Sequence, residues 1–216
     1  MSEPSVMSDP VTTQLTAQES FVYPAHQSPL SLGEGARGRG FSLGGAKGES
    51  PERLSILSIV EDTMVDGPGF RTSIYCAGCP NECPGCHNPQ SWDIRNGHSV
   101  SVEEIMQVIE ADPFANVTFS GGDPMFQPDG FAELAKAIRA RTNKNIWCFS
   151  GFRYEMLLRN PRQRRLLELL DVLVDGPFVQ KLRDESLAFR GSSNQRIIDV
   201  QASLCEDRVV MYQMSA

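Results

Sequence analysis

Apolar and β-branched residues recur along the chain from about residue 54 onward in patterns that predict strands and helices. Short apolar runs bounded by turn residues predict strands at residues 54–60, 71–77, 116–120, 145–149 and 171–174. Apolar positions at helical spacing predict helices that include residues 102–109, 131–138 and 157–170, the last broken at Pro161. Ser101 followed by Glu104 is the capping-box pattern of a helix start.

The order of these elements predicts a fold class. Strands alternate with helices between about residues 100 and 180, which predicts βαβ units, a largely parallel sheet and hence an α/β protein. Polar and glycine-marked loops follow the predicted strands at residues 79–86, 121–124, 150–151 and 175–176. Because ligands bind at the carboxyl ends of parallel strands, we expect these loops to gather along one rim of the sheet.

Residues 1–53 have a different composition. Gly, Ser and Pro make up 20 of these 53 residues, and Leu, Ile, Val and Phe only 9. Such a segment buries too little apolar surface to offset the entropy of ordering it. We therefore predict a disordered, low-complexity tail over 1–53 and one folded domain over 54–216. The sequence leaves open whether the tail is functional or comes from a mis-set start codon.

Charge and hydropathy exclude several classes of protein. The chain has 20 Lys and Arg against 27 Asp and Glu, a formal net charge of −7, which argues against binding nucleic acid through a basic surface. No apolar run approaches the length of a membrane span. The first ten residues have neither the basic nor the apolar region of a secretory signal. We therefore expect a cytoplasmic protein without nucleic-acid or membrane partners.

Four of the six cysteines fall within eleven residues: Cys76, Cys79, Cys83 and Cys86. Without an export signal, this clustering favours a metal site over disulfides. The last three have C-x3-C-x2-C spacing, which suits one soft metal centre. One interpretation is structural zinc with Cys76 or His87 as fourth ligand. The other is a [4Fe–4S] cluster with one iron lacking a protein ligand, which points to catalysis.

C-x3-C-x2-C directly after a strand resembles the radical S-adenosylmethionine enzymes. The resemblance implies a partial, open (β/α) barrel in which Cys79, Cys83 and Cys86 hold a [4Fe–4S] cluster and S-adenosylmethionine chelates the fourth iron. Gly121, Gly122, Asp123 and Pro124 resemble the family's motif for the methionine amino group, in a variant found among glycyl-radical activating enzymes. The resemblance also implies contacts to the cofactor from Gly85, Cys86 and His87.

Further stretches resemble the activators of anaerobic ribonucleoside-triphosphate reductases, over roughly residues 56–200. They lie at residues 66–71, 83–88, 146–152, 172–178 and 190–196, the last reading Arg-Gly-Ser-Ser-Asn-Gln-Arg. The resemblance implies that an external one-electron donor, a flavodoxin or a thioredoxin-type protein, reduces the cluster. Reductive cleavage of S-adenosylmethionine then gives methionine and a 5′-deoxyadenosyl radical, which makes a glycyl radical on the partner reductase. The resemblance implies no catalytic acid or base among the side chains.

Three hypotheses remain open at this stage. The first is this radical enzyme, acting on the nucleotide reductase or on another glycyl-radical enzyme. The second is a zinc-stabilised binding module that uses Cys76, Cys79, Cys83 and Cys86. The third is a degenerate family member that only binds the reductase. If the partner is a protein, the polar loops at residues 175–178 and 190–196 are the candidate docking surface, and replacing Arg190 or Asn194 should impair activation more than cofactor cleavage.

Overall fold

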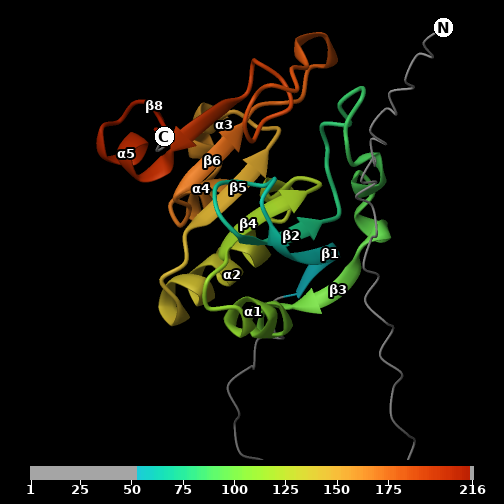
Figure 1. Ribbon diagram of the computed structural model, residues 1–216, viewed down its shortest axis with the longest axis vertical. Coiled ribbons are helices and arrows are strands. Elements are labelled where there is room, and N and C mark those ends of the chain that lie inside the picture. Colours follow the sequence, from blue (N-terminus) through green and yellow to red (C-terminus); the bar gives the residue numbers. More distant parts are fainter. Residues whose placement is uncertain (1–52, 215–216) are drawn as a thin grey trace, which may run out of the picture. The chain divides into compact units, whose positions relative to one another are not determined.

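The computed structural model describes residues 53–214 (Figure 1). The predicted disordered tail, residues 1–53, therefore lies outside the described residues except for Arg53, which is the first residue of a strand. The described chain forms one sheet with the strand order β3-β1-β2-β4-β5-β6-β7-β8. The strands are β1 (Arg53–Thr63), β2 (Arg71–Cys76), β3 (His98–Ser101), β4 (Asn116–Gly121), β5 (Ile146–Ser150), β6 (Val172–Asp175), β7 (Arg196–Asp199) and β8 (Val210–Met211).

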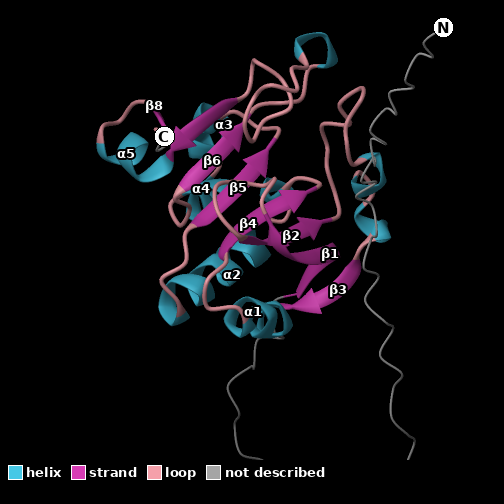
Figure 2. Cartoon of the chain, in the orientation of Figure 1, coloured by secondary structure: helices cyan, strands magenta, loops and turns pink. Residues whose placement is uncertain are grey.

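Helices connect the central strands, as Figure 2 shows. They are α1 (Val102–Ala111), α2 (Pro128–Arg141), α3 (Tyr154–Arg159), α4 (Pro161–Leu167) and α5 (Val200–Cys205), with short 3-10 turns η1 (Pro89–Ser91), η2 (Ile94–Asn96), η3 (Pro124–Phe126) and η4 (Gln180–Leu182). The predicted capping box is confirmed, since Ser101 and Glu104 cap each other's backbone at the start of α1. The predicted break at Pro161 is also confirmed, because α4 starts there with Asn160 as its cap.

The sheet is mixed and open. The four central strands β2, β4, β5 and β6 are parallel, as predicted. Antiparallel strands extend both sides, β1 and β3 next to β2, and β7 and β8 next to β6. The prediction of a largely parallel sheet therefore describes only the centre. The α/β class and the open sheet are confirmed, while a barrel of the radical S-adenosylmethionine type stays a prediction.

The main hydrophobic core lies between the sheet and its helices. Alternate residues of the central strands, including Ile74, Phe119 and Leu173, point to this side and are fully buried. They pack against apolar residues of the helices, such as Ile105 of α1 and Leu134 of α2. This two-layer packing is the usual way for a sheet and its crossover helices to bury their apolar faces.

The opposite face of the sheet is partly polar. The register places Ser73 of β2 beside Thr118 of β4, and Thr118 beside Trp147 of β5. Trp147 is fully buried and contacts the rings of Phe189 and Tyr212, at centroid distances of 5.7 and 5.3 Å. The C-terminal part of the chain therefore covers the β5–β6 end of this face.

Arg71 is buried on the same polar face. Its guanidinium donates to the Thr118 hydroxyl at 2.6 Å, the Val117 carbonyl at 2.7 Å and the Pro68 carbonyl at 3.2 Å. It also lies 5.3 Å from the Trp147 ring centroid, within the range of a cation–π contact. Burial lowers its pKa to about 10. Arg71 thus fixes the turn at residues 66–69 onto the sheet.

Among residues 53–214, no helix combines the length and apolar character that crossing a membrane requires.

Candidate metal centre

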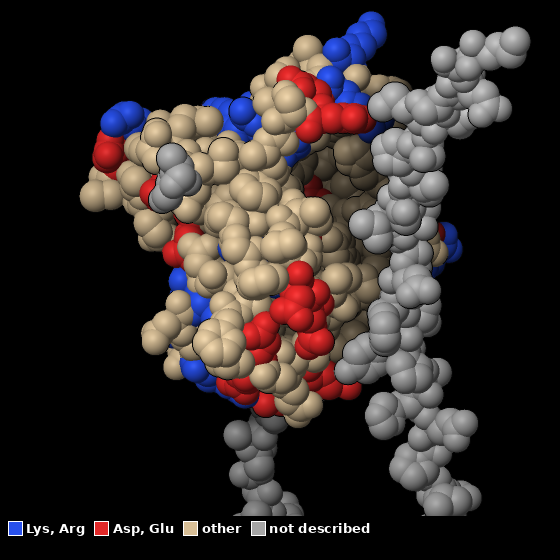
Figure 3. Space-filling view, viewed as in Figure 1, with Lys and Arg blue, Asp and Glu red and all other residues tan. Residues whose placement is uncertain are grey.

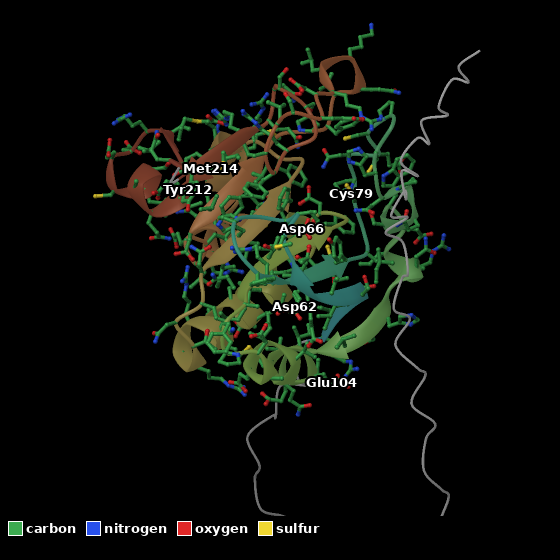
Figure 4. The ribbon with its side chains drawn as sticks, viewed as in Figure 1. Asp62, Asp66, Cys79, Glu104, Tyr212 and Met214 are labelled. Carbon is green, nitrogen blue, oxygen red and sulfur yellow. The ribbon has the colours of Figure 1, made fainter. Side chains whose placement is uncertain are left out.

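The cysteine loop leaves the carboxyl end of β2 and is held there by backbone hydrogen bonds. The amide of Ala77 donates to the Ser55 carbonyl at 3.0 Å, that of Gly78 to the Ser91 carbonyl at 2.7 Å, and that of Cys79 to the Trp92 carbonyl at 3.0 Å. Figure 4 shows Cys79 beyond the arrowheads of the central strands. The first part of the loop is therefore fixed between β1 and the segment around η1.

The six thiols fall into three environments. Cys79, Cys83 and Cys86 are half-buried, Cys205 is exposed, and all are free of disulfide bonds. Cys76 and Cys148 are fully buried in the hydrophobic core. Cys76 is therefore a core residue.

Burial raises the pKa of several of these thiols. It raises the pKa of Cys79, where backbone hydrogen bonds from Asn81 and Glu82 act in the opposite direction. It also raises the pKa of Cys83, opposed by a backbone hydrogen bond from Phe178. N–H groups that donate to cysteine sulfurs also help to set the reduction potential of an iron–sulfur cluster.

Gly121 and Gly122 permit a close approach between β4 and the cysteine loop. Gly121 has φ +95°, and Gly122 donates to the Cys76 carbonyl at 2.7 Å. A Cβ on Gly122 would lie 2.5 Å from the Gly78 carbonyl oxygen, too close for any side chain. Both glycines therefore have a packing role at this site besides any contact to a ligand.

Asp123 joins three loops. Its fully buried carboxylate accepts hydrogen bonds from Asn81 Nδ2 of the cysteine loop at 3.1 Å, and from Ser150 Oγ and the Gly151 amide after β5, both at 3.0 Å. The Met125 amide also donates to it at 3.0 Å. Burial raises the pKa of Asp123 to about 6. Pro124 follows as the buried first residue of η3.

The predicted gathering of loops at one rim is confirmed by these bonds. Asn81 links the loop after β2 to the loop after β4, and Asp123 links the loop after β4 to that after β5. The Gly176 amide, after β6, donates to the Phe152 carbonyl at 3.2 Å. All four parallel strands thus contribute loops to one connected site.

The C-terminal half of the cysteine loop packs against the segment after β6. The ring of His87 lies 5.4 Å from that of Phe178, centroid to centroid. Gly85, at φ +77°, faces the Gln180 side chain, whose Cδ would lie 3.0 Å from a Cβ on this glycine. The positive φ favours glycine at 85, and a larger residue there would also require the exposed Gln180 side chain to move.

The stretch at residues 190–196 bonds within the chain rather than forming a solvated loop. Arg190 donates to the Gln195 carbonyl at 2.9 Å, and Asn194 to the Pro177 carbonyl at 2.8 Å. Arg196 pairs with the buried carboxylate of Asp175 and with Glu155. The expectation that this stretch docks a partner protein stays a prediction.

Sequence reasoning missed a hydrogen-bonded cluster around one carboxylate on the polar face. Asp66, labelled in Figure 4, accepts from the Ser73 hydroxyl at 2.8 Å and from the hydroxyl of Tyr75. Burial and the Asp66 hydrogen bond raise the pKa of Tyr75 above its usual value. Ser73 and Tyr75 alternate along β2, and this alternation of polar residues was the available signal.

The described residues help to distinguish a single metal ion from an iron–sulfur cluster as the group that the cysteine loop would hold. They contain no set of three or more His, Cys, Asp or Glu side chains placed to hold a single metal ion. The zinc module with four cysteine ligands also needs Cys76, which is enclosed in the core, so a zinc site here would have to use His87 instead. An iron–sulfur cluster binds each cysteine to a different iron, so its thiols need not converge on one point. Three free, half-buried thiols on one loop fit that group.

Comparisons with known proteins agree with this chemistry. The chain is 38% identical over 141 residues to the anaerobic ribonucleoside-triphosphate reductase-activating protein of Escherichia coli (strain K12), covering 61% of this chain and 90% of the relative. It is 36% identical over 143 residues to the protein of that name from Vibrio cholerae, covering 62% and 90%. The chain belongs to this family. The relative so named from Enterobacteria phage T4 is 32% identical over 140 residues, covering 62% and 86%.

A family model described as a 4Fe-4S single cluster domain matches residues 65–198 of this family member. The match includes Cys79, Cys83 and Cys86 and the loops after all four parallel strands. It thus covers the whole site described above.

Proposed function

We propose that the protein activates anaerobic ribonucleoside-triphosphate reductase by means of a [4Fe–4S] cluster and S-adenosylmethionine. The observation that carries the proposal is the placement of three free, half-buried thiols at the carboxyl end of β2, joined through Asn81 and Asp123 to the Gly-Gly turn after β4. The names of its relatives and the matching family model support it.

Each part of the site has a role in this proposal. Cys79, Cys83 and Cys86 would hold the cluster, and the open iron would take the amino and carboxylate groups of S-adenosylmethionine. Gly121, Gly122, Asp123 and Pro124 would shape the amino-acid end of the cofactor site, and Gly85, Cys86 and His87 would contact the cofactor. Because Asp123 is fully buried and bonded within the chain, it would act by positioning Asn81 and Gly151.

Cys79, Cys83 and Cys86 would hold the cluster, which, once reduced by the external donor, would supply the electron for cleavage of S-adenosylmethionine to methionine and a 5′-deoxyadenosyl radical; that radical would take a hydrogen atom from a glycine of the reductase. The chain itself orients the bound groups and limits access of water and oxygen. The loops after β4, β5 and β6 do this around the cysteines. An external one-electron donor and a cytoplasmic location belong to the same proposal.

The test is anaerobic reconstitution with iron and sulfide. The proposal expects visible iron–sulfur absorption, cleavage of S-adenosylmethionine on reduction, and a glycyl-radical signal in the reductase. Replacing Cys79, Cys83 or Cys86 with Ser should abolish all three, while Cys205→Ser, at an exposed thiol, should leave them unchanged. A colourless protein that binds one zinc would support the zinc module. A protein that binds the reductase without cleaving S-adenosylmethionine would support the degenerate member.

A further inference from the structure

Residues 176–180 cover one side of the cysteine loop, and their position depends on contacts made from outside the segment. Phe178 faces His87, and Gln180 lies against Gly85. The segment runs from the end of β6 to η4, so it has no strand partner to fix it. Something else must hold it against the loop that carries the cysteines.

The loop at residues 191–195 supplies these contacts. Asn194 Nδ2 donates to the Pro177 carbonyl at 2.8 Å, and Gln195 Nε2 donates to the Gly176 carbonyl at 3.1 Å. Ser192 Oγ accepts from the Val179 amide at 3.2 Å. Three side chains of this loop therefore hydrogen-bond backbone groups of three residues in the segment, Gly176, Pro177 and Val179.

The 191–195 loop is itself closed by one side chain. Gln195 Oε1 accepts from the amides of Gly191 and Ser192, at 2.9 and 3.1 Å. Gly191 lies close to Phe178 and to His87, which follows the last cysteine of the loop. A Cβ on Gly191 would come 3.1 Å from the Phe178 side chain and 3.4 Å from that of His87. The loop thus touches both the segment and the last residues of the cysteine loop.

We propose that residues 191–195 act as a clamp that holds residues 176–180 against the cysteine loop and thereby controls how firmly the cluster is retained. Asn194 and Gln195 are positioning residues in this proposal. The inference rests on the proposed function, because it takes Cys79, Cys83 and Cys86 as the cluster ligands. Removing a residue that orients a metal ligand without binding the metal itself commonly lowers the affinity for the metal on the order of 10-fold to 100-fold.

The test compares Asn194→Ala and Gln195→Ala with the wild-type full-length protein. Gln107→Ala is the matched control, because Gln107 is an exposed glutamine on α1, outside residues 176–180 and 191–195. After anaerobic reconstitution, loss of visible absorption is followed on adding an iron chelator. The clamp predicts loss on the order of 10-fold faster in both variants and unchanged in the control. Loss at the wild-type rate in both variants would overturn it.

Hydrogen exchange on the cluster-free protein makes the test independent of the proposed function. The clamp predicts faster exchange of the Val179 amide in Asn194→Ala and Gln195→Ala, with α1 and α2 protected as in the wild type. Unchanged exchange at residues 176–180 would overturn the clamp. If either variant fails to fold, Gly191→Ala, which crowds Phe178 and His87 without removing a hydrogen bond, takes its place. Failure of the wild type to take up iron would refute the proposed function, and the exchange result would still decide the clamp.

The clamp and a docking role for the same loop predict different results. A docking surface predicts that Asn194→Ala keeps its cluster and cleaves S-adenosylmethionine normally while failing to activate the reductase. The clamp predicts that the cluster itself is lost faster. Full retention of the cluster with loss of activation alone would therefore overturn the clamp in favour of docking.

Discussion

At the scale of single residues, Asp123 has the most connected side chain of the site. Its carboxylate accepts hydrogen bonds from Asn81, Ser150 and two backbone amides, and it has no contact with solvent. The Gly-Gly-Asp-Pro pattern predicts a turn that approaches a ligand. Its partner Asn81 lies 42 residues away in the sequence, so this bond could not be predicted without the fold.

The raised pKa of Asp123 predicts a pH-dependent stability. Burial raises it from 3.8 to about 6, so between these pH values the folded state holds a proton that the unfolded state has lost. The stabilisation that this bound proton contributes is fully present below the pKa of the unfolded state, and it is lost as the pH rises through 6. The free energy of unfolding of the cluster-free wild type, relative to Asp123→Asn, should therefore rise by up to about 3 kcal/mol as the pH falls from about 7 to about 4.

Urea unfolding at a series of pH values measures this difference. Asp129→Asn is the control with the opposite sign, since hydrogen bonds from Arg162 and Arg165 lower the pKa of Asp129. The difference in the free energy of unfolding between the wild type and Asp129→Asn should therefore shrink as the pH falls. A constant difference for Asp123→Asn would contradict the prediction.

The close packing of Gly122 against the Gly78 carbonyl predicts that a larger residue at 122 destabilises the protein. Gly122→Ala would place a methyl group 2.5 Å from the Gly78 carbonyl oxygen, where only a backbone shift can relieve the clash. We expect a loss of about 1–3 kcal/mol in the free energy of unfolding. Gly69→Ala is the control, because nothing lies within 4 Å of its added Cβ and only the strain of φ +72° remains, about 1 kcal/mol. Equal stability of Gly122→Ala and wild type would show that the loop can move away freely.

At the scale of elements, the sequence predicted β1, the central strands and the helices α1 to α4, and missed the strands β3, β7 and β8 and the helix α5. The centre is predictable because its strands are buried, with apolar residues on the face toward the core, and its helices have caps such as Ser101. His98–Ser101 has one apolar residue in four, and Val210–Met211 is only two residues long, so neither has a recognisable period. These strands form because β1 and β7 present free edges for pairing.

Arg71 shows how one side chain joins several elements. Its guanidinium reaches carbonyls or hydroxyls of the 66–69 turn, β4 and the start of β5. Arg71→Met would leave the buried Val117 carbonyl short of one partner and should cost about 3 kcal/mol of stability. Arg71→Lys should restore little, because an ammonium cannot reproduce the fork of donors. Thermal unfolding measures both, and wild-type stability of Arg71→Lys would contradict this account.

At the scale of the whole molecule, the family match lies within the described fold, which extends beyond it at both ends. The family model covers residues 65–198, and the described sheet starts with β1 at Arg53. The charges do not form an extended basic tract on the face seen in Figure 3, where uncharged residues cross the middle of the view. That the protein does not bind nucleic acid stays a prediction from the net charge.

The extent of the fold predicts the effect of truncation. A chain that starts at Arg53 should keep the wild-type midpoint of thermal unfolding and the same iron content after reconstitution. As a control, a chain that ends before Val210 loses β8 and the contact of Tyr212 with Trp147, and should unfold at a lower temperature. A lowered midpoint in the first truncation would assign the N-terminal residues a structural role.

The division of the thiols into enclosed and accessible groups has a practical consequence for chemical labelling. Cys76 and Cys148 are fully enclosed, and burial raises the pKa of both thiols, so an alkylating reagent should reach neither in the folded protein. The cluster-free protein should then take up label at Cys79, Cys83, Cys86 and Cys205, and the loaded protein only at Cys205. Mass spectrometry of the alkylated chain would thus report the fraction of molecules that carry a cluster.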